Sequence, residues 1–469
     1  MKRASKHQFQ KITLAPLGGG INVALSPEQI ADNEMQECEN FIYERDSARL
    51  VGRGGLRSLI TFDSRVKSMF YDIETNTTFV FLENRDCYQL TISSGNVQKR
   101  YLDKVTGYEV PQCCKFNNNL FVASGGLLQY FDYQEQASET GAQIYSLNTI
   151  TSSPICDRLF YRWGRLAVAK RGSDRITYSY VGDAKSDTAW TENMNDDASS
   201  KWLDVGNYDG GDIAEIVPLA TDMIVFKTNG AVYQLVGDAD FNTWAVYNVS
   251  NFSDLTTDFM AGISATNIGN EVVFLSLRGL KTLSTTQDYG NISATDIGSK
   301  FNKLLTANMY EPEMYHLRRY MTILIRPKAD KDYFVAYNYG LNAATILKFG
   351  FSIEYILETK DDLFVGANNT VYQWTEEATM DDDLPINYKL VPKDTIGSDK
   401  LLVKAIDTKF SSDHAGDTLL TIGERLKVTM PCNDRKKIRC NHSEETIHLE
   451  VSSQSRFEVD HIILDVAAL

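Results

Sequence analysis

The chain has 469 residues, of which 43% are hydrophobic and 11% aromatic, and its formal net charge is −15. This composition is typical of a globular protein and argues against intrinsic disorder. The acidic balance repels nucleic-acid phosphates over most of the surface, so a protein that wraps DNA or reads its sequence is disfavoured. No apolar run reaches 18 residues, and we therefore expect no membrane-spanning helix.

Residues 1–11 are basic, but no apolar stretch follows them, so we expect no secretory signal. The seven cysteines have an odd count and irregular spacing, which does not fit a disulfide framework. Both features predict a protein made in a reducing cytoplasm.

Residues 1–60 lack the pattern of the rest of the chain and predict an N-terminal docking arm with one helix. Ser26 and Pro27 are the residue types preferred at the N-cap and the first position of a helix. The triplet Gly18 to Gly20 could approach a phosphate, but the lysine and hydroxyl residue that complete a phosphate-binding loop are missing. We therefore expect this arm to dock on a neighbouring protein and to bind no nucleotide.

The clearest single hairpin lies in residues 223–237, where two β-prone runs flank Asn229 and Gly230. Asn-Gly between such runs is the strongest short-range hairpin signal, and a type I′ turn needs φ above zero at both central residues. We expect Asn229 and Gly230 to form an exposed tip of this type. Because one hairpin is only marginally stable in water, further strands must pack beside it.

Similar hairpin segments recur at intervals of roughly 40–60 residues, the spacing of architectures with one small sheet per repeat. Seven occur, at residues 79–90, 120–132, 159–181, 223–237, 272–283, 322–337 and 363–374. Four of them carry a glutamine after the turn, at Gln89, Gln129, Gln234 and Gln373. A hairpin-rich β-sandwich would also contain such segments, but their near-regular spacing favours a β-propeller of about six to eight blades over residues 61–380.

Two inserts interrupt the repeats. Residues 182–208 are polar and acidic and form the longest excursion from a blade; the residues of interest are Asp183, Trp190, Asp196, Asp197 and Trp202. Residues 298–319 are the best helical window, with Ser299 as a possible N-cap and Phe301 and Leu305 on one face.

Residues 375–383 (TEEATMDDD) and Pro385 predict a solvated linker. Beyond it, short β-prone runs alternate with charged turns, at residues 401–409, 418–422, 426–429, 446–451 and 461–466. This pattern predicts a small C-terminal β-sandwich over residues 385–469. The predicted fold is therefore mainly β: an N-terminal arm with a helix, a propeller and a sandwich.

Catalytic and metal-binding patterns are weak throughout. Asp381 to Asp383 could bind a divalent cation, but a lone acidic run is usually a solvated linker. Cys432, Cys440 and His442 could supply three zinc ligands, but their spacing is wrong and no fourth ligand is near. With 62 acidic residues, the carboxylate pairs that a glycosidase needs arise by chance. We predict no catalytic residue, no metal and no cofactor.

The N-terminal residues resemble the opening of many bacteriophage tail structural proteins. The residues that carry this likeness are Gly19-Gly20-Ile21-Asn22, Ser26-Pro27, Asn33-Glu34, Glu39-Asn40 and Arg53-Gly54. Residues 165–178, followed by Val181-Gly182-Asp183 and Trp190, resemble a blade of the tail nozzle proteins of short-tailed phages. Residues 223–237 and 269–283 fit the same family, which includes the packaged-DNA stabilisation and tail tubular B type proteins. The likeness covers about residues 12–374.

The resemblance implies a structural virion protein and no enzyme. It implies a homohexameric tail nozzle or hub below the portal and its adaptor protein, assembled in the host cytoplasm. Such a ring retains packaged double-stranded DNA, conducts it during ejection without reading its sequence, and carries tail fibre, spike or needle proteins. Gly20, Ile21, Asn22 and Arg53 are then candidate adaptor-docking residues, and the insert at residues 182–208 is a candidate gate or fibre-docking surface.

Two alternative functions remain open at this point. A propeller-fold glycan hydrolase or lyase would be monomeric and would turn over polysaccharide, whereas a nozzle would form rings and turn over nothing. A general protein-interaction propeller would present one exposed face without ring symmetry.

Overall fold

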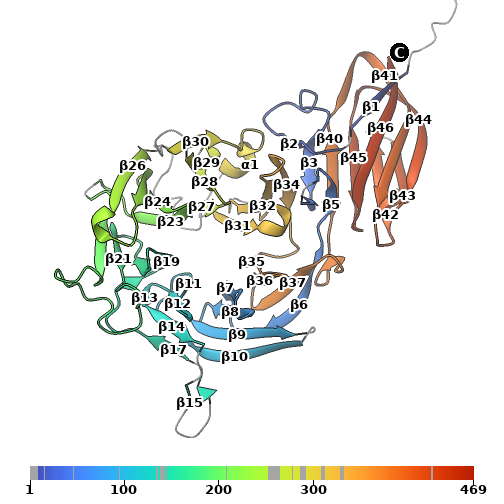
Figure 1. The fold of residues 1–469 in the computed structure, drawn as a ribbon. Helices are drawn as coiled ribbons and strands as arrows, with labels where there is room; N and C mark the ends of the chain where they lie inside the picture. The colour runs from blue at the N-terminus through green and yellow to red at the C-terminus, as the bar shows by residue number, and fades with distance from the viewer. Residues whose placement is uncertain are drawn as a thin grey trace, which may run out of the picture.

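A computed structural model describes residues 9–14, 16–45, 47–93, 96–133, 136–137, 143–144, 146–207, 209–251, 265–276, 278–285, 292–307, 312–327, 332–423 and 426–468. Within these residues nearly all regular structure is β-strand. A ring of small sheets surrounds a central axis, and a pair of packed sheets stands at its side (Figure 1).

The ring is a β-propeller, and the described residues form seven blades of four antiparallel strands each. Each blade runs from an innermost strand at the axis to an outermost strand at the rim (Figure 1). The first three blades are β7(Val66–Asp72), β8(Thr77–Leu82), β9(Asp86–Ser93) and β10(Asn96–Lys104); β11(Gln112–Phe116), β12(Asn119–Ala123), β14(Gln129–Asp132) and β17(Leu147–Thr149); and β19(Arg158–Arg162), β20(Arg165–Ala169), β21(Arg175–Tyr178) and β22(Lys201–Asp204).

The next four blades complete the circle. They are β23(Ile213–Leu219), β24(Asp222–Lys227), β25(Ala231–Val236) and β26(Ala245–Asn251); β27(Ala265–Asn267), β28(Glu271–Ser276), β29(Gly279–Thr285) and β30(Ile292–Asp296); β31(Glu313–Leu317), β32(Thr322–Arg326), β33(Phe334–Asn338) and β34(Ala343–Leu347); and β35(Tyr355–Glu358), β36(Leu363–Ala367), β37(Thr370–Thr375) and β6(Gly55–Thr61). Short extra pairs are β13(Gly126–Leu127) with β18(Ile155–Cys156), β15(Gln136–Ala137) with β16(Gln143–Ile144), and β38(Met380–Asp381) with β39(Leu384–Pro385).

The predicted propeller is confirmed, and each of the seven predicted hairpin segments falls in a different blade. Six segments coincide with the second and third strands of a blade, such as β24 with β25 and β36 with β37. The recurring glutamine makes the same kind of contact in the fourth and seventh blades. Gln234 Nε2 donates to Asp222 Oδ2 at 2.6 Å, and Gln373 Nε2 donates to Asp362 Oδ1 at 2.6 Å. In each case the glutamine of the third strand contacts the start of the second strand.

The ring closes through an N-terminal strand. β6 pairs antiparallel with β37 as the outermost strand of the seventh blade, from Gly55 against Thr375 to Thr61 against Thr370. The predicted domain boundary at residue 60 is therefore wrong, because residues 55–61 belong to the propeller. A strand from one end of the chain that completes a blade from the other end prevents the ring from opening at that blade.

The C-terminal β-sandwich is also present, but it contains the N-terminal residues as well. One sheet has the order β4(Phe41–Tyr43), β5(Leu50–Gly52), β46(Glu458–Ala468), β41(Thr395–Ser411) and β44(Arg435–Ile447), with β1(Gln10–Thr13) paired to β46. The other has the order β3(Glu34–Glu39), β40(Tyr388–Pro392), β45(Leu449–Ser453), β42(Asp417–Ile422) and β43(Leu426–Pro431), with β2(Gly20–Ile21) paired to β3. The described residues between 9 and 60 are thus no separate arm.

One sheet continues from the propeller into the sandwich. β34, the outermost strand of the sixth blade, lies parallel to β3, with Glu39 opposite Ile346. Asn40 N donates to Ile346 O at 2.7 Å, and Thr345 Oγ1 donates to Phe41 O at 2.6 Å. The result is a ten-stranded sheet that spans both parts of the molecule.

The predicted N-terminal helix is wrong. Residues 27–33 form turns, with Gln29 N donating to Ser26 O at 2.9 Å, and the chain then enters β3. Pairing of β3 with β40 buries Met35 and Cys38 in the sandwich core, and this burial outweighs the helix-start signal of Ser26 and Pro27. The helical window at residues 298–319 is confirmed only for α1(Asn302–Thr306), whose N-cap is Phe301 rather than Ser299.

Aromatic side chains of the inner strands fill the seams between blades. Phe79 of the first blade meets Phe131 of the second with ring centroids 5.4 Å apart. Phe226 of the fourth blade meets Phe274 of the fifth at 5.3 Å. All four rings are buried. Each blade is therefore stabilised by apolar area that it shares with its neighbours, which is why a lone hairpin of this type would not persist.

Candidate functional site

The hairpin at Asn229 and Gly230 is confirmed, but its turn type and exposure are not as predicted. Gly230 has φ of +85°, whereas Asn229 is not among the residues with positive φ. Gly230 N donates to Lys227 O at 3.0 Å, so a three-residue loop replaces the two-residue type I′ turn. The loop packs inward: Gly230 is buried, and Asn229 Nδ2 donates to Asp209 O at 3.0 Å.

Residues 182–200 of the acidic insert lie between β21 and the outermost strand β22 of the third blade, at the left rim of the propeller in Figure 1. Residues 201–204 of the predicted insert are β22 itself and belong to the blade. Trp190 is buried between the second and third blades, and its Nε1 donates to Ala184 O at 3.1 Å. Trp202 is 41% exposed and lies under the guanidinium of Arg175, 3.8 Å from the ring centroid. The described residues of the insert lie at the rim of the propeller and not at its axis (Figure 1). Its roles as a gate or fibre-docking surface of an assembly stay predictions.

A buried arginine that the sequence did not single out holds this insert. Arg165 is fully buried, and its Nη1 donates to the carbonyls of Ser179, Ala198 and Ser199 at 2.7, 3.1 and 2.6 Å. Its Nη2 donates to Asp197 O at 2.6 Å. Of the predicted insert residues, Asp197 is exposed, Asp183 and Asp196 are half-buried, and Tyr208 lies outside the described residues.

The predicted adaptor-docking residues are interior residues. Ile21 and Arg53 are 1% exposed, Asn22 is 7% exposed, and Gly20 is buried. Gly20 has φ of +72°, and a Cβ there would lie 2.5 Å from Ala344 N of the sixth blade, so only glycine fits. These side chains are not available to a docking partner in the folded chain. The prediction treated the N-terminal glycine-rich segment as unpacked, whereas in the structure it packs against the sixth blade.

Arg53 lies at the centre of the joint between sandwich and propeller, in the loop between β5 and β6. Its Nε donates to Asn40 Oδ1 at 3.0 Å, and its Nη1 and Nη2 donate to Asp381 Oδ1 and Oδ2 at 2.8 and 2.5 Å. The carbonyls of Gly54 and Lys348 accept at 3.0 and 2.7 Å. The guanidinium also stacks 4.3 Å from the Phe349 ring centroid. Every donor direction of this buried cation is occupied.

The prediction of a solvated linker is wrong for Asp381. Residues 375–383 were expected to be a solvated linker, but Asp381 is 1% exposed and also accepts from Gly350 N at 3.0 Å. The sequence signal was an acidic run, which cannot tell which of three aspartates turns inward. Only the return of β38 against β6, with Asp381 opposite Leu56, brings this carboxylate to Arg53.

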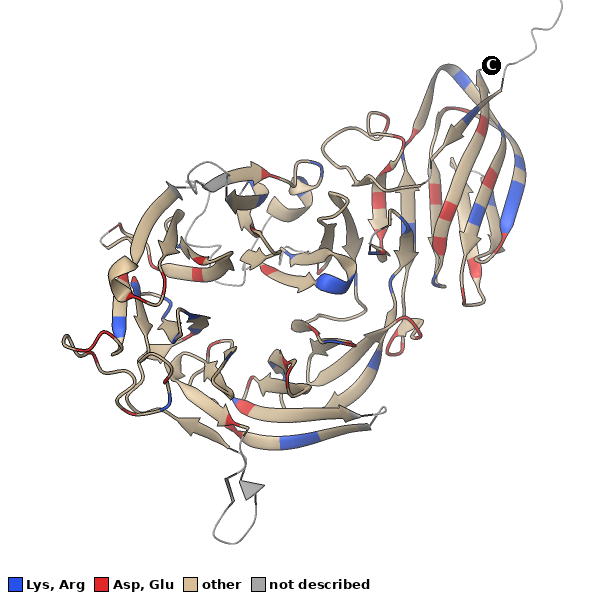
Figure 2. Ribbon diagram, viewed as in Figure 1, with Lys and Arg blue, Asp and Glu red and all other residues tan. Residues whose placement is uncertain are grey.

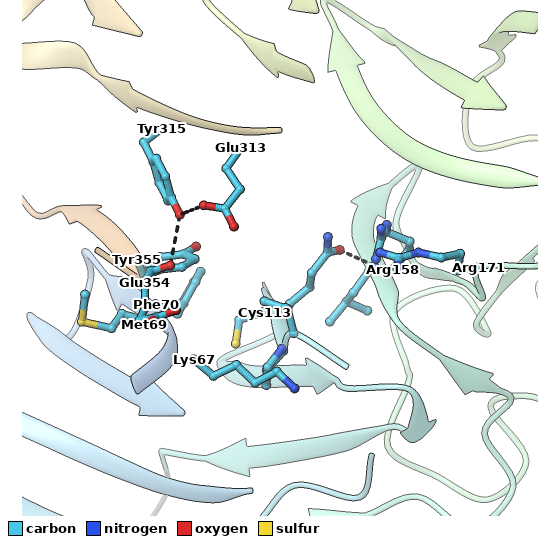
Figure 3. Close-up of a pocket in the computed structure, with 14 residues that line it drawn as sticks. Lys67, Met69, Phe70, Cys113, Arg158, Arg171, Glu313, Tyr315, Glu354 and Tyr355 are labelled. Atoms are coloured by element: carbon cyan, nitrogen blue, oxygen red, sulfur yellow. Dashed lines mark hydrogen bonds between the residues drawn. The ribbon is translucent and has the colours of Figure 1, made fainter. Parts of the chain in front are cut away.

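The axis of the propeller holds two cavities. The inner one has a volume of about 280 Å³ and is lined by residues of β7, β11, β19, β31 and β35 (Figure 3). The wider one has about 1130 Å³ and opens among β23, β27, β31 and β35. Tyr315 and Tyr355 line both cavities, and their rings meet edge to face with centroids 5.4 Å apart. This aromatic pair is therefore the wall that the two cavities share.

Charged side chains of both signs line the axis. Arg326 Nη2 donates to Glu313 Oε2 at 2.6 Å. Tyr315 Oη donates to the same oxygen at 3.0 Å (Figure 3). Across the axis, Arg158 Nε lies 3.6 Å from Glu215 Oε2. Burial raises the pKa of Glu215, although the Arg158 guanidinium acts in the opposite direction. Charges over the rest of the fold are mixed rather than segregated by sign (Figure 2).

The described part of the chain shows neither the pattern of a metal site nor that of a membrane-spanning helix. It contains no group of three or more His, Cys, Asp or Glu side chains placed to hold a metal ion. Cys432 is buried, and its Sγ donates to His414 O at 3.2 Å. All seven cysteines are free thiols. No described helix is long and apolar enough to cross a membrane.

No protein-family model matches the sequence, and no characterised protein matches it significantly. Among solved structures, the WD40 β-propeller domain of Doa1 is similar at 10% identity and a TM-score of 0.44, covering 69% of this chain and 97% of that one. BamB from Moraxella catarrhalis is similar at 11% identity and 0.40, covering 71% and 94%. The Neurospora crassa Pan2 WD40 domain is similar at 10% and 0.43, covering 71% and 97%. At these sequence identities and TM-scores, the likeness supports no statement about the function of this chain.

The sheet order itself defines the class of protein. The described chain is a seven-bladed β-propeller, closed by an N-terminal strand, with a β-sandwich built onto its sixth blade.

Proposed function

We propose that the protein is a structural subunit of a short-tailed phage virion, the tail nozzle or hub. Six copies form a ring below the portal and its adaptor, which retains packaged DNA, conducts it during ejection and carries tail fibres, spikes or needle proteins. The proposal rests on the sequence resemblance together with one structural observation.

That observation is where the residues of the resemblance lie. The N-terminal residues that carry it converge on the joint between sandwich and propeller. Asn22 Nδ2 donates to Glu34 Oε2 at 2.8 Å, and Glu34 Oε1 lies 2.9 Å from Lys300 Nζ near the sixth blade. Asn40 and Arg53 contact each other in the same joint. These contacts give the residues of the resemblance an architectural role, which supports a structural protein.

The joint also suits the mechanical task. A ring subunit that bears the pressure of packaged DNA must transmit load between its parts without a hinge. The ten-stranded sheet continues through the joint, and the buried Arg53–Asp381 pair lies beside it. A sheet and a buried core that run through the joint favour one rigid subunit, because relative motion of domains is expected where their interface is small and polar. An acidic surface toward the channel would then let DNA slide, since tight binding scales with the number of phosphates neutralised.

The test is assembly of the full chain with the head-to-tail adaptor encoded by the same virus. We expect electron micrographs to show closed six-fold rings on the adaptor and light scattering to give the corresponding mass. A chain that stays monomeric with adaptor at micromolar concentration contradicts the proposal. Release of reducing sugar from capsular or cell-wall polysaccharide by that monomer would support a glycan hydrolase, and formation of unsaturated sugar a lyase.

A further inference from the structure

The inner axial cavity has the size and lining of a small-molecule site. Its volume of about 280 Å³ is close to the lower end of ligand pockets, and an apolar cavity of about 150 Å³ is enough for benzene. Phe70, Leu159, Tyr315 and Tyr355 supply much of the wall (Figure 3). A ring with a small polar substituent therefore fits the space.

The carboxylates around this cavity already have cationic partners within the protein. Glu313 is bound by Arg326 at 2.6 Å. Glu354 forms an ion pair with Arg65. Glu215, just across the axis, faces Arg158 at 3.6 Å. Burial raises the pKa of the Cys113 thiol well above its usual value, so this group adds no negative charge.

Two cations at the cavity form no ion pair with a carboxylate among the described residues, although Glu215 lies near enough to Arg171 for the guanidinium to lower its pKa. Arg171 lines the cavity beside Arg158 (Figure 3), and its buried Nε has no hydrogen-bond partner among the described residues. Lys67 lies at the other end of the lining, where its Nζ donates to the carbonyl of Tyr108, which does not neutralise it. A buried donor without an acceptor is costly, and an anionic ligand would supply the missing acceptor and charge.

We propose that the inner axial cavity binds a small organic anion, a carboxylate on an aromatic or aliphatic body. The carboxylate accepts from Arg171, with Lys67 supplying further positive charge, and the body packs between Phe70 and Tyr355. Guanidinium groups match carboxylates in geometry and charge, and such charge-assisted hydrogen bonds are about twice as strong as neutral ones. This site lies within one subunit and is independent of the proposed ring.

The probes are benzoate, benzyl alcohol and benzylamine, which place an anion, a neutral group and a cation on the same ring. Calorimetric titration of the full chain should show saturable binding of benzoate, with the other two at least tenfold weaker. Arg171→Gln should weaken benzoate roughly ten- to hundredfold, the effect of losing one hydrogen bond to a charged group. Lys67→Gln should weaken it less.

The matched control is Arg175→Gln, because Arg175 is an exposed arginine of the third blade that pairs with Asp204 at 2.8 Å, away from the cavity lining. It should bind benzoate like the wild type. Circular dichroism and melting curves establish that each variant is folded, and Lys67→Gln replaces Arg171→Gln as the deciding variant if the latter is not. The proposal is overturned by absence of saturable benzoate binding, by equal binding of the three probes, or by folded cavity variants that bind like the control. Ring formation, measured separately, bears only on the proposed function.

Discussion

Arg53 and Asp381 lie 328 residues apart in sequence and form a buried two-point ion pair, with Nη1–Oδ1 and Nη2–Oδ2 distances of 2.8 and 2.5 Å. Arg53 comes from the loop that leaves the sandwich, and Asp381 from the short strand that follows the last blade. The pair therefore joins the beginning and the end of the propeller at its contact with the sandwich.

Removing one member of this pair should be strongly destabilising. In Asp381→Asn the Arg53 cation stays buried with too little negative charge, which costs about 3–5 kcal/mol in such settings. We expect a clear fall in the urea midpoint of unfolding. Arg435→Gln is the control: it breaks the exposed pair with Asp407, 2.9 Å apart, and should cost about 1 kcal/mol or less. Equal midpoints for the two variants would contradict a central role for the joint.

Replacing Gly230 should test the observed turn. Its φ of +85° is disfavoured for a β-branched residue, so Gly230→Val should lose about 1–3 kcal/mol of unfolding free energy. Gly230→Asn should lose less, because asparagine tolerates left-handed backbone better than valine. Thermal melts of both variants decide the point. An unchanged melting temperature for the valine variant would mean that the turn has another conformation.

Arg165→Met should loosen the acidic insert while the propeller stays folded. The substitution leaves the carbonyls of Ser179, Asp197 and Ser199 without their buried donor, at a cost of about 1–3 kcal/mol. We expect faster amide hydrogen exchange in residues 183–200, measured by mass spectrometry. Arg435→Met, on an exposed arginine of the sandwich that pairs with Asp407, should leave that exchange unchanged. Protection that persists in Arg165→Met would show that the buried Trp190 alone anchors the insert.

The carboxyl of Glu215 should make stability fall as pH rises. Its pKa is raised by burial, with Arg158 and Arg171 lowering it and Asp157 raising it. A raised folded-state pKa gives a contribution that is fully present below the unfolded value of about 4.3 and is lost as pH increases through the folded value. The melting temperature of Glu215→Gln relative to the wild type should therefore rise from pH 4 to pH 8. A constant or falling difference would contradict the raised pKa.

Deleting residues 1–24 should unfold the sandwich rather than free a docking arm. The deletion removes Leu14, Leu17 and Ile21, which are at most 2% exposed in the sandwich core. Burial of each such side chain is worth about 1.5–3 kcal/mol. Limited proteolysis should cut residues 388–468 well before the blades. Deletion of residues 1–8 alone is the control, and a resistant sandwich in the 1–24 deletion would contradict the packing described.

The local sequence determined the repeated part of the fold. Each hairpin has two β-prone runs and a turn between them, so pattern alone located all seven blades. In the sandwich it located β41, β42, β43, β45 and β46, whereas β1 to β5, β40 and most of β44 were not predicted. The same reasoning placed the hairpin at Asn229 and Gly230 but not its turn type, because the contact of Asn229 with Asp209, 20 residues away, is not visible in the local pattern. The local sequence therefore predicts the hairpin, whereas the conformation of its turn depends on contacts with another segment.

Tertiary structure alone decided how the ends of the chain are used. Nothing in residues 26–41 says that they are strand, because their helix-like start is outweighed by pairing with β40 far along the chain. Likewise, the sequence does not indicate that Arg53 or any of the three aspartates at 381–383 is buried. Only ring closure brings Arg53 and Asp381 together. Burial of charge depends on which distant groups share the interior. A single sequence therefore identified this protein's blades, whereas the joint and the axial cavity emerged only once the ring had closed.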